Sequence, residues 1–211
     1  MSLARRYSKS VAFLRAIDRD WARLIAHVGP CRHDAKETRE PYEALVRAIA
    51  YQQLTAKAGD AILGRLIGLS GGKSFPRSAE IITVDVAALR GCGFSASKIA
   101  TIKAIAHGAV SGLVPSGKAA AQMTDHELIE RLTAIKGVGR WTVEMLLMYS
   151  LQRRDVLPAD DFGVREGHRK LKRLRKLPKP EALRVLSEKW SPHRTVAAWY
   201  LWRMPREGFP R

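Results

Sequence analysis

The stretch LTAIKGVGRWTVEMLLMYSLQRRDVLPADD, from Leu132 to Asp161, carries the strongest pattern in the chain. It predicts a helix that runs into a tight glycine hairpin, Lys136-Gly137-Val138-Gly139, and a second helix that opens with Arg140-Trp141-Thr142. Twenty residues after Trp141 comes an acidic pair, Asp160-Asp161, behind the turn signal Leu157-Pro158-Ala159. The stretch therefore combines a narrow backbone turn with a carboxylate at a fixed distance along the chain.

The glycine hairpin is suited to holding an anion. Glycine tolerates positive φ and lets another backbone approach closely, so Gly137 and Gly139 give a narrow turn with exposed N–H groups. These groups lie at the N-terminus of the next helix, where unsatisfied donors and the helix dipole favour negative charge. A phosphate group is the anion that this arrangement suits best. The alternative is a plain helical hairpin in which a glycine only ends the first helix.

Apolar spacing predicts helices along the whole chain. We expect them at 11–28, from Pro41 to about Ile67, at 78–90, 97–110, as a pair within about 124–151, and at 162–176, 180–190 and 193–203, with a loop around 112–117. Thr124, with Glu127 three residues later, matches a capping box at the start of the hairpin pair. No segment alternates with a period of two, so the sequence predicts an all-α fold.

The order of the helices predicts two lobes within one functional unit of residues 1–211. Residues of about 36–152 would form one helical lobe, with the hairpin at 132–145. Residues 1–35 and 153–211 would pack together as the second lobe. We expect a cleft between the lobes, near the acidic turn.

Charge is the strongest compositional signal, with a formal net charge of +17 at pH 7. Residues 152–211 hold sixteen Lys and Arg against seven Asp and Glu, and the densest piece runs from Arg169 to Lys176. A basic chain suits a polyanion, and neutralising phosphates would make binding depend steeply on salt. The alternative is a solvated helix face. Charge alone does not choose between DNA, RNA and membrane.

Cysteine and histidine usage argues against a metal or cofactor. The two cysteines, Cys31 and Cys92, are far apart, which excludes a four-cysteine iron–sulfur cluster, and the six histidines include no HxH or HxxxH pair. Apolar runs fall short of the ~20 residues that span a bilayer, and the first twenty residues do not resemble a signal peptide. We expect a soluble cytoplasmic protein that does not use a membrane.

Three segments together resemble the helix-hairpin-helix superfamily of DNA glycosylases, and most of all its 3-methyladenine DNA glycosylase II branch. They are VRAIAYQQLT (46–55), the hairpin segment 135–144 with GVGRWT, and DVLPADD (155–161). The likeness extends from about Pro41 to Trp202. It implies double-stranded DNA with damaged bases as the partner, no cofactor, and action as a monomer.

By position, Asp161 matches the catalytic aspartate of the superfamily, and Asp160 matches an acidic neighbour that we interpret as a turn or helix N-cap residue. The alternative is that both only cap the next helix. Members with lyase activity place a lysine just after the G-x-G-R of the hairpin, and its amine forms a Schiff base with the sugar. This sequence has Trp141 there, so the resemblance implies base excision without strand cleavage.

The resemblance also implies a base pocket and a DNA-binding surface. Trp141, Trp202 and Phe162 match aromatic pocket positions, and Met145 stands where some relatives have an aromatic residue. We expect Trp21, Trp190 and Trp199 to be core residues. Gln53 matches the residue that wedges into the gap in the DNA at the lesion. Lys98 is either a further DNA contact or a solvated lysine. The implied DNA-binding residues are Gln53, Lys136, Gly137, Val138, Gly139 and Thr142.

The implied reaction releases a damaged purine. The nucleotide must be flipped out of the duplex, and an alkylated, cationic base is already a good leaving group that tryptophan faces attract. Asp161 would stabilise the oxocarbenium-like sugar and orient water. Two other classes stay open at this point: a non-catalytic helix-hairpin-helix module, which needs only the hairpin and basic residues, and a helical RNA-binding protein.

Overall fold

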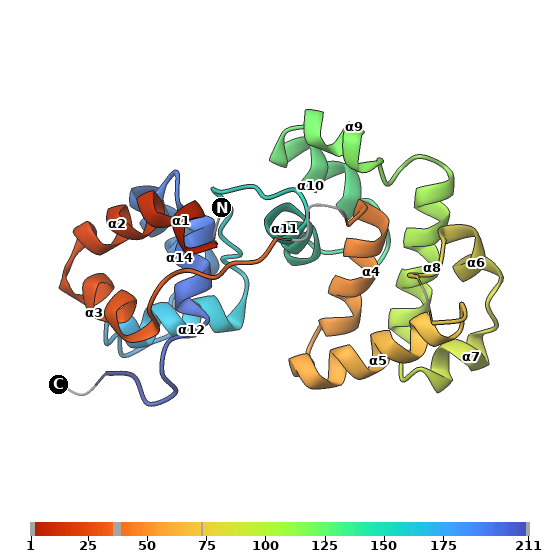
Figure 1. Ribbon diagram of the computed structural model, residues 1–211, viewed down its shortest axis with the longest axis horizontal. Coiled ribbons are helices and arrows are strands. Elements are labelled where there is room, and N and C mark those ends of the chain that lie inside the picture. The colour runs from red at the N-terminus through yellow and green to blue at the C-terminus, as the bar shows by residue number, and fades with distance from the viewer. Residues whose placement is uncertain (1–2, 36–38, 73, 210–211) are drawn as a thin grey trace. The chain divides into compact units, whose positions relative to one another are not determined.

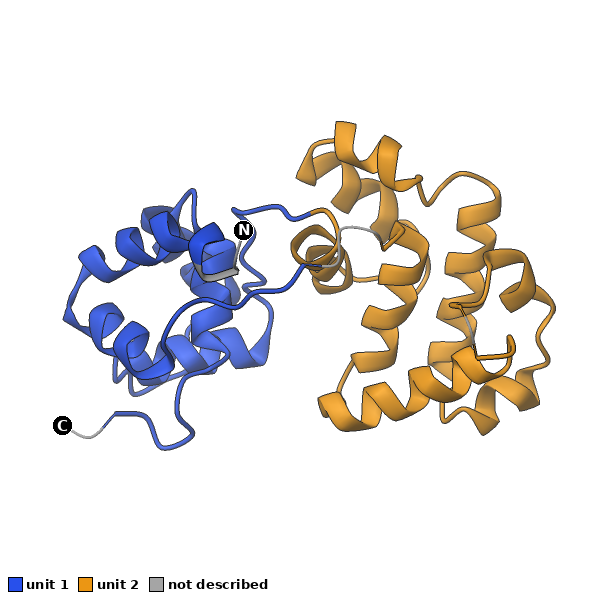
Figure 2. Ribbon diagram, viewed as in Figure 1, with its two compact units in different colours: residues 1–35, 152–211 blue, residues 36–151 orange. Residues whose placement is uncertain are grey.

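The computed structural model describes residues 3–35, 39–72 and 74–209. Every regular element in that part of the chain is helical, which confirms the all-α prediction (Figure 1). The chain forms two compact units, unit 1 from residues 1–35 and 152–211, and unit 2 from residues 36–151 (Figure 2). None of the described helices is both long enough and apolar enough to cross a membrane.

Unit 2 is built around helix α4. Its helices are α4 (Pro41–Tyr51), α5 (Ala56–Gly68), α6 (Ser78–Thr83), α7 (Val86–Gly91), α8 (Ala96–Val110), α9 (Gly117–Gln122), α10 (Asp125–Thr133) and α11 (Arg140–Tyr149). Helix α4 packs against α5, α8 and α11, while α6 packs against α8 and α10 against α11. The core is aliphatic, with Leu45 and Ile49 of α4 and Ile102 and Ile105 of α8 fully buried.

Unit 1 joins the two ends of the described chain around α14. Its helices are α1 (Leu3–Arg6), α2 (Ser8–Ile17), α3 (Arg19–Val28), α12 (Phe162–Leu171), α13 (Pro180–Leu186), the 3₁₀ turn η1 (Ser187–Trp190) and α14 (Arg194–Leu201). Helix α14 packs against α2, α3, α12 and η1. Trp21 and Trp190 meet edge to face with centroids 5.3 Å apart. Both are buried, as is Trp199, which confirms the three core tryptophans.

Two predicted long helices are wrong because each is two helices. The expected helix 11–28 breaks at Asp18, whose backbone is extended and whose carboxylate accepts a hydrogen bond from the amide of Trp21 at 3.0 Å. The expected helix from Pro41 to Ile67 breaks after Tyr51, and Thr55 caps the second piece. Apolar periodicity continues across both breaks because both pieces face the same core, so periodicity alone did not locate them.

Smaller differences have local causes as well. The expected helix 78–90 is split by Val84 and Asp85, and Asp85 caps α7. The expected loop around 112–117 is present as far as Ser116, which caps a helix that was not predicted, α9. Helix α12 ends at Leu171, before a left-handed Arg173 with φ +52°. The helix pair within 124–151 is confirmed, and so is the capping box of Thr124 and Glu127.

Candidate active site

The hairpin needs its first glycine for two reasons. Gly137 has φ +87°, and a Cβ there would lie 1.9 Å from Oγ1 of Thr101 on α8. The turn is closed by a 2.9 Å hydrogen bond from the amide of Val138 to the carbonyl of Ile135. The Val138 side chain is buried and anchors the hairpin, whereas Lys136 and Gly139 are exposed. The close approach therefore fixes the turn against α8 within unit 2.

Helix α11 leaves the hairpin with Gly139 as its N-cap, and no side chain caps it. The first amides of a helix have no acceptor inside the helix, so this end favours an anion. Thr142 lies one turn further in and is fully buried. Its amide donates to the carbonyl of Gly139 at 3.0 Å, and its hydroxyl accepts from Nε2 of Gln52 at 3.1 Å. Thr142 thus links the hairpin to the turn after α4 and does not face solvent.

The turn after α4 presents Gln53. This residue is exposed and left-handed, with φ +57°, an uncommon conformation for a residue other than glycine. Lys98 holds the turn, because its Nζ donates to the carbonyls of Ala50 at 3.1 Å and Gln52 at 2.8 Å. Burial lowers the pKa of the Lys98 ammonium. Neither interpretation of Lys98 from the sequence describes this role, since its ammonium is bound to backbone carbonyls at the end of α4.

A pocket of about 270 Å³ lies within unit 2. It brings together two of the predicted pocket residues, Trp141 and Met145. Its lining is Arg39, Ala44, Arg47, Ala48, Tyr51, Trp141, Met145, Tyr149 and Ser150. Glu43 pairs with both arginines, at 3.5 Å to Arg39 and 2.7 Å to Arg47. The walls are mainly aromatic and apolar, and one carboxylate beside the pocket offsets part of the arginine charge.

Tyr51 is fixed in this pocket by α5. A Cβ at Gly59 would lie 2.2 Å from Cδ1 of Tyr51, so only glycine leaves room for the ring. The Tyr51 hydroxyl donates to the carboxylate of Asp60. Burial, followed by this hydrogen bond and the negative charge of Asp60, raises the pKa of Tyr51. The ring is therefore held as a neutral aromatic wall.

In unit 1, Asp161 is the N-cap of α12. Its Oδ1 accepts two hydrogen bonds of 2.8 Å, from the backbone amide of Val164 and from the indole Nε1 of Trp202. A Cβ at Gly163 would lie 2.9 Å from Trp202 Cδ1 and 3.1 Å from Asp161 Oδ1. The glycine therefore makes room for the contact between the carboxylate and the indole.

The other members of the predicted site in unit 1 differ in setting. Asp160 lies in the turn before α12, as one of our two interpretations has it, but it is not the helix cap, and its carboxylate pairs with Arg184 of α13 at 2.5 Å. Trp202 is half-buried and directly follows the last residue of α14, which places it at the C-cap and not within the helix. Phe162 is 67% exposed, so its ring is available to a ligand.

The comparisons with known proteins identify the family. The model of the HhH-GPD superfamily of base excision DNA repair proteins matches residues 46–193. The chain belongs to this superfamily. DNA-3-methyladenine glycosylase 1 of Schizosaccharomyces pombe is 48% identical over 197 residues, which cover 93% of this chain and 86% of the relative. An alkylbase DNA glycosidase-like protein of the same organism is 36% identical over 95% of this chain and 94% of its own length.

Solved structures of the HhH-GPD type show the same fold. That of 3-methyladenine DNA glycosylase from Schizosaccharomyces pombe in complex with abasic DNA matches with a TM-score of 0.86 at 47% identity, covering 92% of this chain and 95% of that one. A DNA-3-methyladenine glycosidase from Bacillus halodurans matches with a TM-score of 0.76 at 34% identity, covering 92% and 88%.

Two aromatic residues of this HhH-GPD chain were missed as pocket residues by reasoning from the sequence. Tyr149 lies four residues after Met145 on α11, and a helical count from Trp141 through Met145 would have found it. The sequence placed Tyr51 only within the segment 46–55 that carries the resemblance, and its place in the pocket depends on Gly59 of another helix.

The structure gives no group that would hold a metal among the described residues, where no three His, Cys, Asp or Glu side chains come together. Cys31 and Cys92 are both buried and unbridged. Burial raises the pKa of the Cys31 thiol to about 11. Both cysteines are therefore packing residues.

Proposed function

We propose that this HhH-GPD protein is a DNA glycosylase that hydrolyses the N-glycosidic bond of alkylated purines, of the 3-methyladenine type, in duplex DNA and so begins base excision repair. One observation carries the proposal: the carboxylate of Asp161 is held by the amide of Val164 and the indole of Trp202. A carboxylate fixed by two N–H donors at a helix start stays in one orientation. Asp161 also follows the hairpin along the chain, as the catalytic aspartate of this superfamily does.

The chemistry that Asp161 supports is charge stabilisation. When the bond between sugar and base breaks, the sugar becomes oxocarbenium-like, and a fixed carboxylate beside it stabilises that charge and orients the attacking water. An alkylated purine already carries positive charge and leaves without strong acid catalysis. One carboxylate is therefore sufficient, whereas most glycoside hydrolases need two.

The pocket of unit 2 supports recognition of a flipped, cationic base. Faces of Trp141, Tyr51 and Tyr149 attract a positively charged ring through their quadrupoles. Met145 adds an apolar and polarisable wall. Trp202 and the exposed Phe162 offer further aromatic surface in unit 1 beside Asp161. Selection for cationic over neutral purines follows from these faces.

DNA would be held by the hairpin and by the turn after α4. The amides that open α11, with the exposed Lys136, suit backbone phosphates. Gln53 stands at the apex of a turn fixed by Lys98, where it suits insertion into the stack beside the lesion. Double-stranded DNA with damaged bases is the proposed partner. Action as a monomer and a cytoplasmic location stay predictions.

The proposed enzyme releases the base and leaves the strand intact. A lyase reaction needs an amine that attacks the sugar, and the position just after the hairpin's G-x-G-R is Trp141, whose indole cannot form a Schiff base. The expected product is therefore an abasic site that breaks only on treatment with alkali.

The test is release of free base from an alkylated duplex by the wild type, Asp161→Asn and Asp160→Asn. Asparagine is an effective N-cap and keeps the Oδ1 acceptor, so Asp161→Asn should fold normally and lose the charge alone. We expect a loss of release of about 100-fold or more. Asp160→Asn is the matched control, because it changes the neighbouring carboxylate, and it should keep most of the activity.

The outcome also separates the enzyme from a non-catalytic DNA-binding module. Wild type that binds the duplex in a salt-sensitive way and releases no base would indicate the module. Release that survives Asp161→Asn would reject the catalytic role of this carboxylate. Strand breaks that appear before alkali is added would reject the assignment of a glycosylase without lyase activity.

A further inference from the structure

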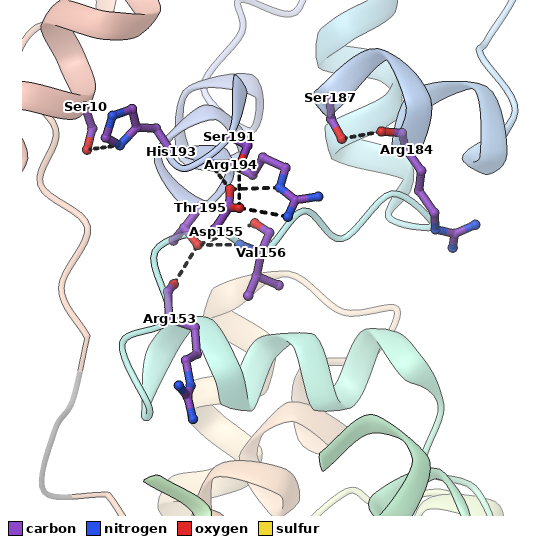
Figure 3. A network of polar contacts seen from close by, with 10 residues as sticks. All are labelled: Ser10, Arg153, Asp155, Val156, Arg184, Ser187, Ser191, His193, Arg194 and Thr195. Carbon is purple, nitrogen blue, oxygen red and sulfur yellow. Dashed lines mark hydrogen bonds and ion pairs between the residues drawn. The ribbon is translucent and has the colours of Figure 1, made fainter. Parts of the chain in front are cut away.

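The segment that carries Asp161 is irregular, and its two ends are tied to opposite ends of one helix. Residues 152–161 contain no helix. The Asp161 end is bound to Trp202, the residue just after α14. The other end, from Arg153 to Val156, is bound to the first turn of α14 (Figure 3).

Asp155 makes the first part of this attachment. Its Oδ1 accepts from Nε of Arg194 at 2.8 Å and from the amide of Arg194 at 3.2 Å. Its Oδ2 accepts from Nη2 of Arg194 at 2.8 Å and from the hydroxyl of Ser191 at 2.7 Å. The N-cap residue of α14, His193, caps nothing with its side chain. Asp155 therefore caps the N-terminus of α14 and also forms a bidentate ion pair with Arg194, which is a strong and directional arrangement.

Thr195 makes the second part and is almost completely buried. Its hydroxyl donates to the carbonyl of Arg153 at 2.7 Å and accepts from the amide of Val156 at 3.1 Å. Its own amide donates to the carbonyl of Arg154 at 3.1 Å. One side chain thus pairs with the backbone on both sides of Asp155. We call Asp155, Arg194 and Thr195 the α14 clamp.

The electrostatics keep the ion pair between Asp155 and Arg194 intact at neutral pH. Burial alone would raise the pKa of the Asp155 carboxyl, but the hydrogen bonds from Arg194 and Ser191 outweigh burial and lower it. The carboxylate therefore stays charged, and breaking it from Arg194 would leave two partly buried charges unpaired, which is costly.

We propose that the α14 clamp is a positioning device for the reaction: α14 serves as the template that sets where Asp161 stands, with Arg194 and Thr195 as positioning residues, given the catalytic role proposed above for Asp161. Between clamp and carboxylate, the segment runs through buried Val156, Leu157 and Ala159. A shift at the clamp is therefore carried to Asp161 through packed atoms. A misplacement of about 1 Å in a reacting group can cost about 100-fold in rate.

The test compares Thr195→Val and Thr195→Ser under single-turnover conditions on a duplex with one alkylated purine. Valine keeps the shape and removes the hydroxyl, while serine restores it. We expect Thr195→Val to lower the rate constant of base release by about 10- to 100-fold, and Thr195→Ser to stay close to the wild type. Affinity for a duplex with a tetrahydrofuran abasic analogue should stay within about 2-fold, because the clamp does not serve binding.

A second measurement shows whether the clamp acts through Asp161. In an Asp161→Asn background, Thr195→Val should lower the residual rate no further, because residues that act as a unit are not additive. Arg194→Lys, which keeps the charge and loses the two-bonded geometry, should behave like Thr195→Val. Glu166→Gln is the matched control, since it breaks an equally close pair with Arg169 on α12 and should leave the rate unchanged.

The results that overturn the proposal are distinct from those that overturn the glycosylase assignment. A wild-type rate for Thr195→Val would rule out the positioning role. So would a fall in both rate and affinity that matches the loss of folded protein measured by circular dichroism. A further loss in the Asp161→Asn background also removes it. If Asp161→Asn itself keeps the wild-type rate, the proposed function fails whatever the clamp variants do.

Discussion

The glycine hairpin at 136–139 and the basic run at 169–176 both indicated a polyanion from the sequence, yet the structure gives them different settings. Part of the run is paired within unit 1, where three carboxylates meet four of its six cations: Arg169 and Lys170 pair with Glu166, Lys172 with Asp18 and Asp20, and Arg173 with Asp20. The hairpin has one lysine, Lys136, which is exposed and has no acidic partner among the described residues. Charge along a sequence therefore measures composition, while charge available to a phosphate depends on the fold.

The largest effect in this comparison is expected at Gly137. Gly137→Ala places a methyl group 1.9 Å from Thr101 Oγ1 and holds alanine at φ +87°. Steric overlap and a left-handed backbone together should lower the free energy of unfolding by about 3–4 kcal/mol. Denaturant unfolding measures it. The matched control is Gly139→Ala, where a Cβ meets open space and φ is −93°, and we expect a change of less than about 1 kcal/mol.

A double variant separates the two causes at Gly137. Thr101→Ala removes the hydroxyl that the new methyl group meets, so Gly137→Ala with Thr101→Ala should recover part of the lost stability. The part that remains is the backbone strain. Equal stability for Gly137→Ala and Gly139→Ala would show that the hairpin does not press against α8 as described.

The next effect concerns His168, which lies in α12 just before the run. Burial, followed by the nearby charges of Lys172 and Lys189, lowers the pKa of His168 to about 4. An unfolded histidine has a pKa of about 6.5, so the unfolded state takes up a proton first. Stability should therefore be full above pH 6.5 and fall by up to about 3 kcal/mol as the pH drops from 6.5 to 4.

Unfolding curves between pH 4 and 7 test this for the wild type and His168→Leu, which has no titrating group there. The variant should lose most of the slope. His126→Gln is the control, since the side chain of His126 is 88% exposed, and it should leave the slope unchanged. The carboxyl pKa values of Asp18 and Asp155 lie below their usual range, so their contributions are lost only at lower pH. A full slope in His168→Leu would place the acid sensitivity elsewhere.

The sequence predicted what local chemistry determines. Two glycines around Val138 specify the hairpin, and Thr124 with Glu127 specifies the start of α10, because those bonds join residues only a few positions apart. The break at Asp18 is equally local, because its cap bond joins residues three positions apart, but apolar periodicity runs across it and hid it. The run's ion pairs were not predictable in this way. Lys172 and Asp18 stand 154 residues apart, and their 2.7 Å contact exists only once unit 1 is folded.

The residues of the candidate site show the same difference between local and long-range contacts. Trp141 and Met145 lie four residues apart on α11, so helical spacing places both in one pocket. The fixing of Tyr51 by Gly59, and the contact of Asp161 with Trp202, join different helices. The sequence indicated Asp161 and Trp202 by resemblance, but the hydrogen bond between them is a product of the packing of α12 on α14.

Lys172→Met tests whether the run is structural. The side chain of Lys172 is only 19% exposed, and its ammonium bonds Asp18 at 2.7 Å and Asp20 at 2.9 Å. Its loss should lower the free energy of unfolding by about 1–2 kcal/mol, because two charge-assisted hydrogen bonds disappear. Affinity for duplex DNA should stay at the wild-type value. An affinity loss with unchanged stability would mean that the run contacts DNA after all.

Lys136→Met is the counterpart at the hairpin and has the smallest expected effect. An exposed lysine without an ion pair adds little to stability, so the unfolding midpoint should not move. Duplex affinity should fall by about 3- to 10-fold and the slope of log affinity against log salt by about 1, because one phosphate contact is lost. Lys118→Met, at an exposed position on α9, is the control and should change neither. If Lys172→Met changes the slope of log affinity against log salt and Lys136→Met does not, the run contacts DNA and the hairpin lysine does not.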